Sequence, residues 1–220
     1  MSFAKFRFLA LAVLCFLIVG LFVLNVFSMI CPPSLVAYGE GTPVVTVREN
    51  DFLCTGISQV LSDDENLYVL FDQYGVVQVY TLDGTYRYTI SVYNHANGRT
   101  EIAVLKNRLY IEDKKSNLYV FENGSLVQYL DSSESYELRQ RLSFGTWDAD
   151  YMVKAGSVWY APDGVESHCV VQRPVWLGLY QNDGITMLMF LLVAVSGGLL
   201  LLPKRKVTVG FGLTQQFTQY

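Results

Sequence analysis

Residues 57–92 read ISQVLSDDENLYVLFDQYGVVQVYTLDGTYRYTISV, and residues 102–130 read IAVLKNRLYIEDKKSNLYVFENGSLVQYL. The two stretches align, with Asp83-Gly84 at the position of Asn123-Gly124. Asp-Gly and Asn-Gly accept a positive φ and close tight hairpins between apolar runs. The pattern predicts two copies of one unit, each an antiparallel meander of short strands. The expected strands are 57–61, 67–71, 76–80 and 86–92 in the first copy, and 102–105, 109–111, 118–121 and 126–130 in the second.

Further elements flank the two copies. Val44–Val47 is apolar and β-branched, which predicts an extra strand before the first copy. Asp131 and Glu134 have the spacing of a helix capping box, so a short helix is expected from Asp131 to about Leu142. A degenerate third copy is expected after it, because terminal repeats are often atypical. Its predicted strands are Tyr151–Val153, Val158–Tyr160 and Cys169–Gln172.

Apolar positions that correspond between the copies define the expected core. Residues 67–71 are apolar throughout, which predicts a strand that is buried on both faces. The side chains expected to be buried are Leu67, Tyr68, Val69, Val79, Leu109, Tyr110, Val120 and Trp159.

Asn66-Leu67-Tyr68-Val69, followed by VQVYTLDGTY at residues 77–86, resembles the blade repeats of NHL-type and related six-bladed propellers. The resemblance covers residues 57–130 and implies antiparallel β-meander repeats in a partial β-propeller. Closed propellers typically have four or more blades, so three arrangements stay open. These are an arc capped by the 131–142 helix and the 34–51 connector, a ring completed by a second copy of the chain, and a compact β-sandwich. Propellers of this group bind proteins, sugars or nucleic acids, and some are enzymes, so the fold does not select a function.

Two apolar segments flank the β region. Residues 8–30 carry no charge and can cross a hydrocarbon layer of ~30 Å as a helix. A cleaved signal peptide is the alternative, although its apolar core would be only ~7–15 residues long. Residues 185–202 are also uncharged and just long enough to span. The predicted organisation is an N-terminus at 1–7, a transmembrane helix at 8–30, an all-β extracytoplasmic domain at 31–184, a transmembrane helix at 185–202 and a tail at 203–220.

Charge is distributed unevenly along the chain. All 20 acidic residues lie between Glu40 and Asp183 with only 11 of the 16 basic ones, so this span has a net charge of −9. Such a domain does not neutralise phosphate, which argues against a nucleic-acid partner. Lys5, Arg7 and Lys204–Lys206 lie outside the two apolar segments. The positive-inside rule then predicts a multi-pass protein of a bacterial plasma membrane with both termini in the cytoplasm.

Three of the four cysteines lie in the predicted extracytoplasmic region, where disulfides form. Cys54 precedes the first copy and Cys169 ends the third, so a Cys54–Cys169 disulfide would join the two ends of the domain. The alternative is that these thiols do not pair. Cys31 lies at the membrane edge and could link two subunits.

Candidate catalytic and metal sites are sparse. His95 lies in a polar loop, and His168 neighbours Cys169, but sequence neighbours on a strand point to opposite faces. Asp63-Asp64-Glu65-Asn66 and Asp148-Ala149-Asp150 are acidic enough for calcium but lack the EF-hand pattern, so solvated turns are expected. No catalytic residue, cofactor or metal ligand is predicted.

The expected function is therefore non-enzymatic. The first hypothesis is a binding or scaffold protein, held in the lipid bilayer, that presents its β domain outside the membrane to an unknown protein partner. The second is a subunit of a larger membrane assembly whose ectodomain is a docking piece.

Overall fold

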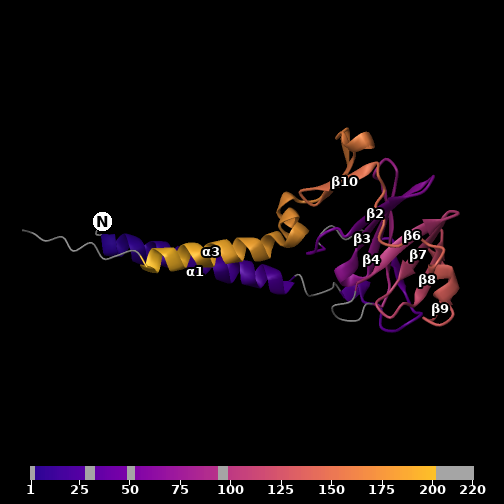
Figure 1. The fold of residues 1–220 in the computed structure, drawn as a ribbon, viewed down its shortest axis with the longest axis horizontal. Helices are drawn as coiled ribbons and strands as arrows, with labels where there is room; N and C mark the ends of the chain where they lie inside the picture. The colour runs from indigo at the N-terminus through magenta and orange to yellow at the C-terminus, as the bar shows by residue number, and fades with distance from the viewer. Residues whose placement is uncertain (1–2, 28–32, 49–52, 94–98, 202–220) are drawn as a thin grey trace, which may run out of the picture.

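The computed structural model describes residues 3–27, 33–48, 53–93 and 99–201. Figure 1 shows a hairpin of two helices with a β domain at one end. α1 (Phe3–Phe27) runs toward the domain and α3 (Gly184–Leu201) runs away from it, so the two helices lie side by side and antiparallel. The β domain thus lies between the helices in sequence and at one end of both in space.

The first predicted copy forms one antiparallel sheet. The order of its strands is β1-β5-β4-β3-β2, and every neighbouring pair is antiparallel. The extra strand predicted at 44–47 exists, and it extends this sheet by pairing with β5. The strands are β1 (Val44–Thr46), β2 (Gln59–Ser62), β3 (Asn66–Phe71), β4 (Val76–Thr81) and β5 (Tyr86–Ser91).

The second and third copies each form a sheet of their own. The second sheet has the order β6-β7-β8-β9 and the third has the order β10-β11-β12, both antiparallel. The predicted strands of all three units are confirmed within one or two residues at each end. They are β6 (Glu101–Leu105), β7 (Arg108–Glu112), β8 (Leu118–Glu122), β9 (Ser125–Leu130), β10 (Tyr151–Lys154), β11 (Ser157–Tyr160) and β12 (His168–Val171).

The first sheet is the middle layer of the domain. Alternate side chains of β3 point to its two faces, and the whole strand is buried, as predicted. Phe71 and Val76 pack with Val158 and Val171 of the third sheet. On the opposite face, Tyr68 and Val77 pack with side chains of the second sheet such as Ile102 and Phe121.

The expected core is confirmed with one exception. Leu67, Tyr68, Val69, Val79, Leu109, Tyr110 and Val120 are all buried. Trp159 is only half-buried, and the prediction that it belongs to the core was wrong. It sits in the third sheet between Met152 and Cys169, and the ammonium group of Lys154 lies 5.9 Å from its ring centroid. This row faces away from the first sheet, because Val158 and Val171 lie on the face of the third sheet that packs against the first sheet.

The helix predicted at 131–142 is much shorter in the structure, since α2 covers only Tyr136–Arg139. The capping residues are used as expected: Asp131 Oδ1 accepts the Glu134 N–H at 3.0 Å, and Glu134 Oε2 accepts the Asp131 N–H at 3.4 Å. They close a turn instead of starting a long helix, because the following chain bends to lay its apolar side chains on the second sheet. Leu138, Leu142 and Phe144 cover Tyr110 and Val120 there.

The arrangement agrees with the capped arc at one end only. The 131–144 segment covers the outer face of the second sheet, but the connector supplies edge strand β1 instead of a cap. β2 lies next to both β6 and β10, so the first strands of the three repeat units are neighbours. Within the described ranges the sheets do not close into a propeller.

The hairpin contains one helix that is long and apolar enough to cross a membrane. Residues Phe8–Val26 have a mean hydropathy of 2.9, and 6% of them are buried. A signal sequence has the same properties near an N-terminus. α3 qualifies as a candidate span only together with the 3-10 segment η4 (Val175–Asp183), from which it is bent by 83°. The described residues therefore show one such helix, and the predicted second span is not shown as a separate one.

Candidate functional site

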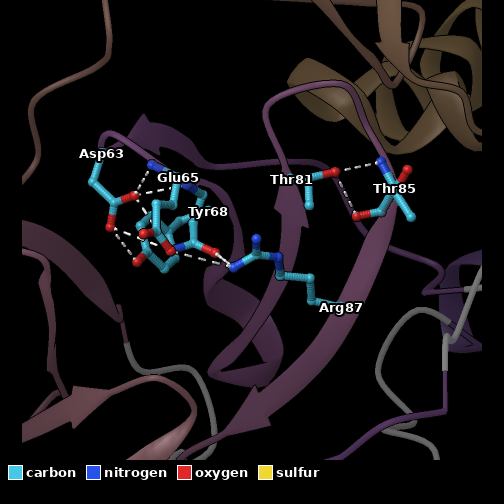
Figure 2. Close-up of polar contacts among 7 residues, drawn as sticks. Asp63, Glu65, Tyr68, Thr81, Thr85 and Arg87 are labelled. Atoms are coloured by element: carbon cyan, nitrogen blue, oxygen red, sulfur yellow. Dashed lines mark hydrogen bonds and ion pairs between the residues drawn. The ribbon is translucent and has the colours of Figure 1, made fainter.

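The acidic turn before β3 is a structural element. Asp63 Oδ1 accepts the backbone N–H groups of Glu65 and Asn66 at 2.8 and 2.7 Å, and its Oδ2 accepts the Tyr68 hydroxyl at 2.6 Å (Figure 2). Arg87 donates to Asn66 Oδ1 at 2.6 Å. Burial and the adjacent carboxylate both raise the pKa of Tyr68, so its hydroxyl stays protonated and keeps donating. Both carboxylate oxygens of Asp63 are thus hydrogen-bonded within this part of the first sheet.

Asp113 organises the turn before β8 in the same way. Its Oδ1 accepts the N–H groups of Lys115 and Asn117, both at 2.9 Å, and its Oδ2 accepts the Asn117 side-chain amide. Asp148 Oδ1 accepts the Asp150 N–H at 3.0 Å in a third turn of this type. Across the described ranges, no group of three or more His, Cys, Asp or Glu side chains is placed to hold a metal ion.

A hollow of about 490 Å³ lies where the second sheet meets the 131–144 segment. It adjoins two smaller hollows of about 260 and 150 Å³, because Glu112 and Arg139 line the first of these as well and Arg99 and Glu101 line the second. We call the three together the charged groove. Its polar lining is Ser58, Gln59, Asp72, Arg99, Thr100, Glu101, Glu112, Asp113, Lys114, Ser116, Arg139 and Gln140, with Trp147 at one end.

Opposite charges pair across the groove. Arg139 donates to Glu112 at 2.7 Å, and these side chains are 28% and 16% exposed. Arg99 and Glu101 pair at 3.0 Å, but the Arg99 side chain is 76% exposed. The inner pair is therefore held more firmly, since solvent screens an exposed pair. The groove offers both donors and acceptors with little net charge.

Two buried polar atoms of the groove have no hydrogen-bond partner among the residues that the structure describes. They are Thr100 Oγ1 and Arg139 Nε. A buried polar group without a partner costs about 1–3 kcal/mol. Such atoms are typical of sites that are completed by a ligand or an ordered water.

Gln59 fixes the place of the groove. This β2 residue is 3% exposed, and its side-chain amide accepts the Ile102 N–H at 3.0 Å and donates to the Ile102 carbonyl at 2.9 Å. The same Nε2 donates to the Thr146 carbonyl at 2.6 Å. One side chain thus joins β2, β6 and the loop that leaves the 131–144 segment, and the 150 Å³ hollow opens beside this junction.

The predicted Cys54–Cys169 disulfide is not formed in the structure. Cys169 Sγ lies 3.6 Å from the Val158 carbonyl oxygen, to which it donates, and Cys54 interacts with the Tyr180 hydroxyl. Each thiol therefore has a separate environment. Burial raises the pKa of Cys169, which keeps it in the less reactive thiol form. Cys31 lies outside the described residues.

His168, the histidine that the structure describes, contacts Ser167 and Tyr160. His168 is exposed on β12, its Nδ1 is 3.2 Å from the Ser167 hydroxyl, and its ring centroid is 5.5 Å from that of Tyr160. His95 lies outside the described residues, as do Lys204–Lys206.

Sequence reasoning did not identify the charged groove. Arg99, Glu101, Glu112 and Arg139 come from three separate segments, and none belongs to a motif. The one available signal was the sequence Arg99-Thr100-Glu101, in which a polar run enters a predicted strand.

Comparison of the chain with family models and with curated proteins finds no match.

Proposed function

We propose that this chain is a membrane-anchored, non-enzymatic binding or scaffold protein with its β domain outside a bacterial plasma membrane and both termini in the cytoplasm. The observation that carries the proposal is the exposure of apolar side chains along the helical hairpin. Phe8 and Phe16 of α1 are 77% and 79% exposed, and Phe190 and Met187 of α3 are 71% and 69% exposed. Side chains of this size are stable in such numbers when lipid surrounds them.

The charge pattern supports the orientation. Five basic residues and no acidic residue lie at positions 1–7 and 203–220, and the region between the two apolar segments carries the net charge of −9. Basic residues that flank a span favour the cytoplasmic side.

Cysteine labelling in intact cells tests the topology. The four native cysteines are replaced by serine, and a single cysteine is placed either at Lys106, in the exposed β6–β7 turn, or at Thr214, in the C-terminal tail. A membrane-impermeant maleimide should label Lys106→Cys in intact cells and label Thr214→Cys only after permeabilisation. Labelling of Thr214→Cys in intact cells would contradict the proposed two spans, because the C-terminal tail would then lie outside the membrane.

The charged groove is the ligand site in this proposal. Its paired charges and its two unpartnered buried polar atoms suit a polar ligand that both donates and accepts hydrogen bonds. The detergent-solubilised protein is purified, and what copurifies is compared with the Arg139→Gln variant. Loss of the copurified species in a folded variant supports the groove, and unchanged copurification contradicts it.

The outer face of the third sheet favours the second candidate function, a subunit of a larger membrane assembly. Met152, Trp159 and Cys169 form one cross-strand row there that is only half-buried within the described chain. A half-buried Trp within a row of apolar side chains is typical of a protein interface. If Trp159→Ala dissociates a stoichiometric partner and Arg139→Gln does not, this second function replaces the first.

A further inference from the structure

The segment η4 joins the β domain to α3 and has two unlike faces. Leu177 is fully buried, whereas Val175 is 80% exposed, Trp176 42% and Leu179 37%. The rings of Trp176 and Tyr180 make an edge contact with centroids 6.3 Å apart. One face of η4 thus packs on protein and the other presents large apolar side chains.

The inner face of η4 is fastened to the β domain. The side-chain amide of Gln181 accepts the Ile57 N–H at 2.9 Å and donates to the Ile57 carbonyl at 2.8 Å. Gly178 lies so close to the β10–β11 turn that a Cβ there would be 2.8 Å from the Ala155 carbonyl oxygen. Close backbone packing and paired hydrogen bonds leave η4 little freedom to move relative to the domain.

The other connections of η4 lead to the hairpin. The Tyr180 hydroxyl donates to the Leu24 carbonyl at 2.9 Å, which places it beside the domain-facing end of the apolar stretch Phe8–Val26. α3 leaves η4 at an angle of 83°. A segment nearly perpendicular to a membrane-crossing helix lies along the membrane surface.

We propose that η4 lies in the headgroup layer of the phospholipid bilayer and holds the β domain at a fixed height and tilt above it. Val175, Trp176 and Leu179 enter the lipid, and the Gln181–Ile57 hydrogen bonds transmit that position to the first sheet. Trp and Tyr favour this layer because each combines an apolar body with a polar group. The inference rests on the membrane anchoring proposed above.

Lipid quenching of Trp176 tests it. The chain has three tryptophans, so Trp147→Phe with Trp159→Phe leaves Trp176 alone, and Trp159→Phe with Trp176→Phe leaves Trp147 as a matched control that is 45% exposed. Both proteins are reconstituted into phosphatidylcholine vesicles. Lipids brominated near the headgroup should quench Trp176 at least twofold more than they quench Trp147, and aqueous acrylamide should show the reverse order.

Flotation of the same vesicles separates the two proposals. Protein that floats with the vesicles while Trp176 and Trp147 are quenched alike by both reagents would overturn the placement of η4 and leave the anchoring intact. Protein that does not float would overturn both.

Discussion

The turn at Gly84 places the first sheet in close contact with the third. Replacing Gly84 with alanine tests how these two sheets are packed. Gly84 lies between β4 and β5 with φ = +88°. A Cβ at this position would overlap the carbonyl oxygen of Val170 on β12 and lie 2.9 Å from the carbonyl carbon. Gly164 is the matched control, because its φ is +76° and no atom of the described chain lies within 4 Å of its Cβ position.

The magnitude follows from two separate costs. Both variants place alanine in the left-handed region, which costs about 1–2 kcal/mol. Gly84→Ala also forces the turn and β12 apart, and overpacking of this kind costs about 1–3 kcal/mol. The free energy of unfolding should therefore fall by about 2–5 kcal/mol in Gly84→Ala and by about 1–2 kcal/mol in Gly164→Ala.

Urea unfolding of the full chain in mild detergent, followed by tryptophan fluorescence, measures both values. Trp159 lies in the third sheet and reports its loss directly. If the two variants are destabilised equally, within about 0.5 kcal/mol, the turn does not bear on β12 and the reasoning fails.

Three further predictions concern titratable groups. Tyr68→Phe should lower the free energy of unfolding by about 1.5–3 kcal/mol, because the Tyr68 hydroxyl donates to the Asp63 carboxylate (Figure 2). Urea unfolding measures this change, and a loss below about 0.5 kcal/mol would contradict the hydrogen bond. Hydrogen bonds from the Ser133 hydroxyl and from backbone N–H groups lower the pKa of Asp131, so its stabilising effect is present above its ordinary pKa and is lost as the pH falls through the lowered value. Between pH 7 and pH 3 the midpoint of thermal unfolding should accordingly fall less in Asp131→Asn than in the parent protein. An identical fall in both proteins would refute this. Burial raises the pKa of Cys169, so alkylation of its thiol by iodoacetamide should be slow at pH 7 and should accelerate only above the usual pKa range of thiols. Mass spectrometry follows the alkylation, and a Cys169→Ser control identifies the signal of this residue. Fast labelling at pH 7 would show that the thiol is not shielded.

The strands could be predicted from sequence because their limits are set locally. Asp83-Gly84 and Asn123-Gly124 fix two hairpins, and the structure gives both glycines a positive φ. Local similarity was a poorer guide to position within a unit. The tetrapeptide Asn-Leu-Tyr-Val occurs twice. At residues 66–69 it belongs to β3, and at residues 117–120 it leads into β8. These strands are the second of the first unit and the third of the second, so the shared letters reflect the Asp–Asn turn before each of them.

Packing between the sheets, and the groove with it, could not be predicted in this way. The hydrogen bonds of Gln59 join residues 43 positions apart and 87 positions apart. A glutamine in a strand gives no sign of such partners. The length of α2 was overestimated for a related reason, because the Asp131–Glu134 capping pattern marks where a helical turn starts but does not determine where the helix ends.

Gln59 has a consequence for the behaviour of this domain at high concentration. β2 is the outermost strand of its sheet, and an open strand edge recruits strands from other chains. The Gln59 amide bridges from β2 to Ile102, and the Val60 carbonyl accepts the Asp148 N–H at 3.0 Å. The Val60 carbonyl at the outer edge of β2 is thus already paired within the chain, and the Gln59 side chain holds β6 beside that edge. The contacts of Gln59 and Val60 therefore also protect the protein against aggregation. Their loss would expose the edge of β2 to strands of other chains before it unfolds the core.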